Sequence, residues 1–156
     1  MRKGEDRHEV GAEVFAWLFP LDAARPGLIR GVALDGDAAV LDASLGPAEG
    51  GRWTWRLFDA PGNGRRVVLE VHQRRGPGGI STLDQVSARF YSSARLDVDS
   101  AWAPVRAHLE RHHGSPSRDV GQVLKLVWSV EGGARLSACR YQDERGESVL
   151  DLALRR

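Results

Sequence analysis

Arginines and tryptophans gather between residues 52 and 75, and together these side chains could bind single-stranded nucleic acid. Cationic side chains neutralise phosphates, and flat indole rings stack on bases. The candidate residues for this role are Arg52, Trp53, Trp55, Arg56, Arg65, Arg66, Arg74 and Arg75. Because Asp59 and Glu70 are the acids of this stretch, its formal charge is six minus two, or +4. The competing interpretation is a half-buried hairpin with its tryptophans in the core and its arginines in water.

Asp59 and the tripeptide Glu70-Val71-His72 place two acids on neighbouring predicted strands. This pattern resembles that of restriction-like nucleases, in which an acid near the end of one strand and an acid-x-lysine on the next gather a divalent metal. The resemblance implies metal-dependent cleavage of nucleic acid. However, His72 stands at the lysine position, and the preferred strand register puts Asp59 and Glu70 on opposite faces. A cross-strand ion pair between Arg56 and Glu70 is therefore the favoured interpretation.

Two histidines on a predicted helix, His108 and His112, are four residues apart and could share a metal. A zincin motif requires a glutamate directly after the first histidine, where this chain has Leu109. No carboxylate or cysteine lies at a telling ligand spacing, so we expect neither a metal site nor a cofactor. Instead, His112 and His113 are expected to end the helix, where positive charge is favoured.

A pocket for a small molecule, or an enzyme site, is a further alternative if the predicted sheet curves around a cavity. The candidate lining residues are Trp17, His72, Phe90, Trp128 and Tyr141. His72 could then act as an acid or a base. The same residues are equally what an ordinary core requires. Cys139, on a predicted strand, fits an inert core position better than a nucleophile.

The overall composition predicts a single globular domain spanning residues 1–156. Its 42% hydrophobic and 28% charged residues are ordinary for such a domain. The 22 basic and 21 acidic side chains leave a net charge of +1, which predicts no general attraction to nucleic acid or to a membrane. Because Cys139 is the single cysteine, no internal disulfide can form, and no signal peptide is evident. We therefore expect a cytoplasmic protein with no membrane partner.

The first third of the chain gives the weakest structural pattern. Residues 1–8 are mostly charged and are predicted to be disordered. Residues 9–19 fit either a helix with one apolar face or a strand with two bulky faces, and the two bulky faces favour a buried strand. A hairpin of residues 28–34 and 38–45 is predicted next, around a turn at 35–37.

The second predicted hairpin joins Arg52–Asp59 to Arg66–Arg74 around a turn at residues 62–64. A three-residue loop gives the best cross-strand pairs. It places Trp55 opposite Val71, Leu57 opposite Leu69, and Arg56 opposite Glu70. By the alternation of side chains along a strand, Trp53 and Trp55 share the face of Leu57, which indicates the core.

The remaining elements are predicted from periodicity. Strict alternation indicates a strand over residues 86–98, and a helix follows at about 101–113, capped by Asp99 or Ser100. Three more strands, at 122–130, 135–141 and 148–154, form a meander. The expected pairs are Val130 with Leu136, Ala138 with Leu152, and Tyr141 with Val149.

These elements predict an α+β, β-rich fold. We expect an antiparallel, hairpin-built curved sheet or a partly closed barrel, with one main helix (about 101–113) packed on it. The order of elements resembles that of tube-forming phage-tail and secretion proteins, which implies assembly. Because no chemistry-bearing cluster accompanies this hairpin pattern, we expect a non-catalytic protein-binding or structural assembly module, whose partner is another protein or a second copy of itself. Nucleic-acid binding through residues 52–75 is the first alternative, and the small-molecule pocket is the second.

Overall fold

The computed structural model consists of an antiparallel sheet with helices on one side. The described residues are 12–23, 25–34, 41, 43, 45–50, 52–56, 66–75, 78, 81–91, 98–120 and 124–156. The strands are β1 (Arg52–Arg56), β2 (Arg66–Arg75), β3 (Ser81–Tyr91), β4 (Ser117–Val120), β5 (Leu124–Ser129), β6 (Arg135–Gln142) and β7 (Ser148–Arg155). The helix α3 spans Asp99–His113, the 3-10 helices η1 and η3 span Ile29–Gly31 and Glu131–Gly133, and residues 12–18 form a further helix.

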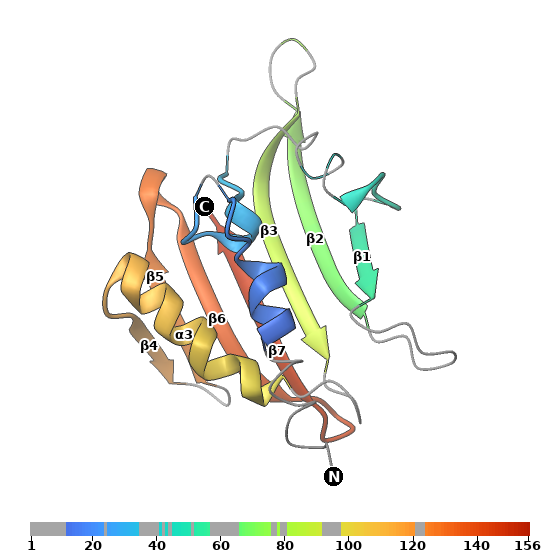
Figure 1. The fold of residues 1–156 in the computed structure, drawn as a ribbon. Helices are drawn as coiled ribbons and strands as arrows, with labels where there is room; N and C mark the ends of the chain where they lie inside the picture. The colour runs from blue at the N-terminus through green and yellow to red at the C-terminus, as the bar shows by residue number, and fades with distance from the viewer. Residues whose placement is uncertain are drawn as a thin grey trace.

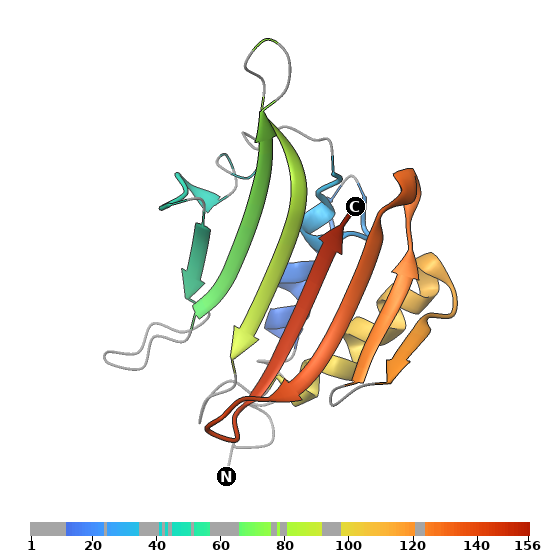
Figure 2. The same ribbon diagram turned by 180° about the vertical axis from the view of Figure 1, so that it is seen from behind.

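The seven strands lie in the order β1-β2-β3-β7-β6-β5-β4. Because β1 and β4 are edges that do not pair with each other, the sheet is open. Both α3 and the helix at 12–18 lie over one face of it (Figure 1), and no described helix covers the opposite face (Figure 2). The prediction of an α+β, β-rich fold is confirmed, and of its two forms, a curved sheet or a partly closed barrel, the structure has the curved open sheet.

Alternation along β7 separates the helix-covered face from the uncovered face, which we call the open face. Leu150, Leu152 and Leu154 belong to the hydrophobic core, whereas Val149 and Ala153 are buried outside it and lie on the open face. The predicted pairs of Ala138 with Leu152 and Tyr141 with Val149 are confirmed. By the same registers, the open face also carries Ser87, Arg89, Tyr91, Ser137, Cys139, Tyr141 and Asp151.

The hairpin of β1 and β2 forms, but its register differs from the prediction by four residues. Trp55 lies opposite Val67, where Val71 was expected, and Glu70 lies opposite Arg52. A shift of four keeps the parity, so Trp53 still faces the core, where it is buried. The described part of β1 ends at Arg56, and the predicted turn at 62–64 falls outside the described residues.

The strand predicted at 86–98 begins earlier, at Ser81, and is described as far as Tyr91. In the meander, Leu136 lies opposite Trp128, where Val130 was expected, because the 3-10 helix η3 lengthens the connection. A short fourth strand, β4, pairs with β5 at the edge. The sequence did not predict β4, since three of its four residues are polar.

Two predictions for the first third of the chain are wrong. Residues 12–18 are helical, with Trp17 and Leu18 buried while Ala16 is exposed, so the spacing is that of one apolar helical face. The first arm of the predicted hairpin contains a 3-10 turn in which Arg30 has a φ of 52°. Its second arm is helical at positions 41, 43 and 45, while residues 1–8 and 35–37 lie outside the described part of the chain.

Contact with the helix at 12–18 explains the second error. The Arg30 guanidinium donates a hydrogen bond of 2.7 Å to the Trp17 carbonyl and lies 4.7 Å from the centre of the Trp17 ring. These contacts need Arg30 in a left-handed conformation that no strand allows. Packing on a distant segment therefore outweighs the local hairpin pattern.

The predicted helix at 101–113 is α3, which begins two residues earlier. Neither Asp99 nor Ser100 is its N-cap; Val98 holds that position, and Asp99 instead accepts a hydrogen bond from Ser148. The helix ends at Gly114, whose φ of 85° suits glycine. No helix of the described chain is long and apolar enough to cross a membrane.

Candidate functional site

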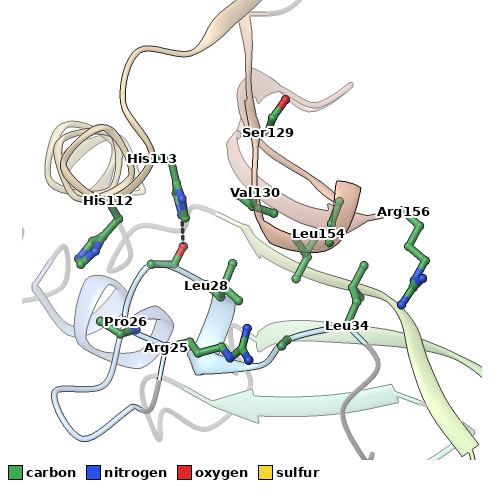
Figure 3. Close-up of a pocket in the computed structure, with 14 residues that line it drawn as sticks. Arg25, Pro26, Leu28, Leu34, His112, His113, Ser129, Val130, Leu154 and Arg156 are labelled. Atoms are coloured by element: carbon green, nitrogen blue, oxygen red, sulfur yellow. Dashed lines mark hydrogen bonds between the residues drawn. The ribbon is translucent and has the colours of Figure 1, made fainter.

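An open cleft of about 820 Å³ lies where the C-terminal end of α3 meets the segment 25–34 and the β5–β6 connection (Figure 3). Its lining residues are Arg25, Pro26, Gly27, Leu28, Ala33, Leu34, His112, His113, Ser129, Val130, Gly132, Ala134, Leu154 and Arg156. This volume falls within the ordinary range for small-molecule sites. We refer to this site as the cleft.

The floor of the cleft is apolar and continuous with the hydrophobic core. Leu28, Ala134 and Leu154 are buried, and both Leu34 and Val130 pack against the core while remaining partly exposed. Apolar atoms at the bottom of an accessible cleft favour a ligand that carries a hydrocarbon or an aromatic body.

Among the lining residues that the structure describes, the polar side chains are basic or neutral and none is acidic. Figure 3 shows the guanidinium groups of Arg25 and Arg156 beside the apolar side chains of Leu28, Leu34 and Leu154. His112 and His113 come from the last turn of α3. Guanidinium groups bind carboxylate and phosphate groups in a two-pronged geometry, so the cleft favours an anionic head group.

Two histidines of α3 clamp the wall of the cleft in place. His108 Nε2 donates a hydrogen bond to the carbonyl of Pro26, and His113 Nε2 donates one to the carbonyl of Gly27 (Figure 3). Since a carbonyl can only accept, both rings carry a proton on Nε2. A Cβ atom on Gly27 would lie 2.8 Å from the Cβ of His112, so only glycine permits this approach.

His108 is also the centre of an aromatic cluster. Its ring lies 4.2 Å from that of Phe19, 4.5 Å from that of His112 and 5.2 Å from that of Phe15, measured between centroids. Its exposed fraction is 9%. Burial lowers the pKa of His108 below the ordinary value of 6.5, and the charges of His112, Arg111 and His113 act in the same direction, while the hydrogen bond to Pro26 opposes them.

The lowered pKa of His108 makes the stability of the protein fall in mild acid. As the pH drops through about 6.5, the unfolded chain binds a proton on this histidine before the folded chain does. The contribution is complete above that pH and is lost progressively as the pH approaches the lower folded value. We expect His108→Gln, which can still donate to the Pro26 carbonyl, to reduce the loss of stability between about pH 7.5 and about pH 5.5.

Urea denaturation of both proteins at the two pH values measures this effect. The comparison stops at about pH 5.5 because burial raises the pKa of Glu13 from 4.5. At lower pH, protonation of Glu13 therefore increases the stability of the folded chain, which opposes the effect of His108. An equal loss of stability in the variant and in the native chain would contradict the assignment to His108.

The structure describes few of the side chains proposed for nucleic-acid binding in residues 52–75. Arg52 is exposed on the open face and forms an ion pair with Glu70 at 3.2 Å. Trp53 is buried, and its indole N–H donates to the Gly46 carbonyl at 2.8 Å. The side chains of Trp55, Arg56, Arg66, Arg74 and Arg75 are not among those described, and Arg65 lies outside the described chain.

The five residues proposed for a pocket inside the sheet do not come together. Trp17, Phe90 and Trp128 are buried on the helix-covered face, where the rings of Trp17 and Phe90 meet edge to face at 5.6 Å. His72 and Tyr141 lie on the opposite, open face. Trp17, Phe90 and Trp128 pack within the core and are not among the described lining residues of the cleft.

The residues considered for a metal site or as a nucleophile can be placed only in part. His108 and His112 lie side by side, with ring centroids 4.5 Å apart. Glu70 pairs with Arg52 and His72 is exposed, while Asp59 lies outside the described residues. In the described chain, no three His, Cys, Asp or Glu side chains gather as a metal site requires. Cys139 lies half-buried on the open face and not in the core, and burial raises the pKa of its thiol, which disfavours the reactive thiolate.

The residues of the cleft escaped prediction because they come from four distant segments. Arg25-Pro26-Gly27 and Gly132-Gly133 read as ordinary turns in the sequence, and Arg156 follows the last strand. The one available signal was the placement of His112 and His113 at the end of a helix. In comparisons with known proteins, no family model, curated protein or solved structure matches this chain.

Proposed function

We propose that the protein is a non-catalytic binding domain that holds an amphipathic organic anion in the cleft. The observation that carries this proposal is the combination of a floor continuous with the core and two arginines at its border. A hydrocarbon or aromatic body would rest on Leu28, Leu34 and Leu154. A carboxylate or phosphate head would bind the guanidinium groups of Arg25 and Arg156.

Both parts of such a ligand are needed for useful affinity. Each methylene group transferred from water to an apolar surface contributes about 0.8 kcal/mol, and association itself costs about 4 kcal/mol or more. Several buried methylene groups are therefore required before binding becomes measurable. A charge-assisted hydrogen bond to an arginine adds about 1.5–3 kcal/mol, which selects the sign of the head group.

Isothermal titration calorimetry with three ligands that share one ten-carbon chain tests the proposal. Decanoate is expected to bind about tenfold or more tightly than 1-decanol, a difference of about 1.4 kcal/mol, and decyltrimethylammonium is expected to bind most weakly. Equal affinity for the three ligands would show hydrophobic binding that does not select the charge of the head group, and would contradict the role given to the arginines. Preference for the cation, or no binding of decanoate, would overturn the proposal.

Reversing one charge at the border of the cleft should remove the preference for the anion. Arg25→Glu is expected to weaken decanoate binding by about tenfold to a hundredfold and to leave 1-decanol binding nearly unchanged. Arg145→Glu is the matched control. This exposed arginine lies in the β6–β7 turn, at the end of β6 and β7 that is far from the cleft. The same loss in both variants would assign the effect to net charge and not to the cleft.

The sequence-based expectation of a protein-binding or assembly module stays a prediction, as does cytoplasmic location. The cleft takes precedence because its apolar floor and cationic border specify a ligand, whereas the polar open face is what water-facing sheets ordinarily present.

A further inference from the structure

A row of hydrogen-bond donors without an acid crosses the open face at the end of the sheet where β7 finishes. His72 lies opposite Gln85, Gln85 opposite Arg155, and Arg155 opposite Arg135. The four residues therefore stand side by side on β2, β3, β7 and β6, and we call them the donor row. Asp84, in the bulge next to Gln85, already has an interaction partner of its own.

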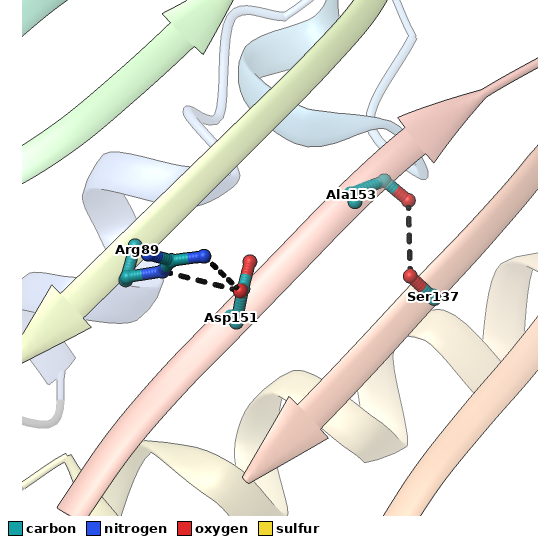
Figure 4. Close-up of polar contacts among 4 residues, drawn as sticks. All are labelled: Arg89, Ser137, Asp151 and Ala153. Carbon is teal, nitrogen blue, oxygen red and sulfur yellow. Dashed lines mark hydrogen bonds and ion pairs between the residues drawn. The ribbon is translucent and has the colours of Figure 1, made fainter. Parts of the chain in front are cut away.

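The pairing of Arg135 with Arg155 is unfavourable unless something else neutralises it. Like charges directly opposite each other on neighbouring strands repel. Two other arginines of the open face are neutralised, since Arg89 binds Asp151 at 3.0 Å (Figure 4) and Arg52 pairs with Glu70. Within the described part of the chain, neither Arg135 nor Arg155 forms an ion pair. Two adjacent arginines, flanked by the further donors Gln85 and His72, favour an anionic partner.

Next to the donor row, the open face carries small side chains that project little above the sheet. Ser87, Ala153 and Ser137 follow on the three central strands, and the Ser137 hydroxyl donates to the Ala153 carbonyl (Figure 4). Small side chains here let a ligand backbone approach the sheet while its charged groups reach Arg135 and Arg155. Lys125, which lies opposite Cys139, adds a further cation on β5.

Two tyrosines stand at the other end of the same strands. Tyr91 and Tyr141 lie on either side of Val149, whose side chain is buried between them. Tyr141 is six residues from Arg135 along β6, a distance of about 20 Å at ~3.3 Å per residue. Aromatic rings on the exposed face of an antiparallel sheet are platforms on which unpaired bases stack.

We propose that the open face binds single-stranded nucleic acid, with phosphates at Arg135 and Arg155 of the donor row and bases against Tyr91 and Tyr141. The phosphodiester backbone of a nucleic acid supplies repeated negative charges that can pair with the Arg135 and Arg155 guanidinium groups. The bases of the same strand supply flat rings that stack on tyrosines. An acidic peptide without aromatic residues, such as polyglutamate, would supply the charge but no ring for the tyrosine end. The bound strand would run along β6 and β7, over the low row of small side chains.

Fluorescence anisotropy with a labelled fifteen-residue oligothymidylate tests this proposal at low and moderate salt. The double variant Arg135→Ala/Arg155→Ala is expected to weaken binding about tenfold and to lower the salt slope by about 1.4, at about 0.7 for each lost phosphate contact. The matched control is Arg118→Ala/Arg145→Ala, two exposed arginines outside the open face, which should change neither quantity. Tyr141→Leu should weaken binding without changing the salt slope.

Misfolding and alternative partners have separate readouts. Because the double variant removes a like-charge pair, its urea midpoint should stay unchanged or rise, and decanoate binding in the cleft should stay intact. Absence of oligothymidylate binding by the native chain at low salt would overturn the proposal. An equal loss in the control variant, or equal competition by polyglutamate, would also overturn it, the latter in favour of an acidic protein partner.

Discussion

Replacing Trp128 with alanine is expected to lower the free energy of unfolding by about 3–5 kcal/mol. Trp128 has an exposed fraction of 1% and is among the largest fully buried side chains of the described chain. Its removal would leave a cavity between β5 and α3 that the backbone cannot close. The indole N–H also donates a hydrogen bond of 2.9 Å to the carbonyl of Gly114, where α3 ends. Urea denaturation measures the loss.

Trp128→Phe separates the two roles of this side chain. Phenylalanine retains most of the apolar volume but cannot donate to the Gly114 carbonyl, so we expect a smaller loss of about 1–3 kcal/mol. Because Gly114 directly follows His113, this variant should also weaken decanoate binding in the cleft. A loss of less than about 1 kcal/mol for Trp128→Ala would contradict the placement of the side chain in the core.

Gly27→Ala is expected to destabilise the protein by about 1–3 kcal/mol and to weaken decanoate binding markedly. The added methyl group would lie 2.8 Å from the Cβ of His112 and 2.9 Å from the Nε2 of His113. A Cβ atom next to the backbone cannot move aside as the end of a flexible side chain can. The segment at 25–28 must therefore shift away from α3, and with it the wall of the cleft. Urea denaturation and calorimetry with decanoate measure the two effects.

Gly146→Ala is the control for this prediction. Gly146 has a φ of 77° in the β6–β7 turn, and a Cβ atom there meets no atom within 4 Å. Alanine at this position strains the backbone without a clash and should cost about 1 kcal/mol. It should leave decanoate binding unchanged, because the turn lies at the other end of the strands. If both variants affected binding equally, the contact of Gly27 with α3 would not shape the cleft.

The C-terminal strands were predictable because short turns fix their register. The turn at residues 143–147 leaves few ways to pair β6 with β7, and the apolar pairing of Ala138 with Leu152 selects among them. The longer connection from Arg56 to Arg66 leaves several registers with the same parity. The sequence therefore predicted the buried face of Trp53 correctly and its partner on β2 incorrectly.

The first third of the chain was not predictable in the same way. Its local patterns fit strands, but the conformation of Arg30 depends on the carbonyl and ring of Trp17, thirteen residues earlier. The cleft depends on still longer contacts, such as that between Gly27 and His113. The spacing of residues within one segment does not indicate which distant segments come into contact. The cationic border and the apolar floor of the cleft could therefore be identified only from the structure.

The most direct test of the binding proposal is the site at which decanoate binds, measured by titrating the isotope-labelled protein and following its backbone amide resonances. We expect saturable shifts at Leu28, Ala33, Val130, Ala134 and Leu154, and little change at Asp151 or Cys139 on the open face. Shifts centred on the open face, or shifts that do not saturate at any residue of the cleft, would contradict the proposal.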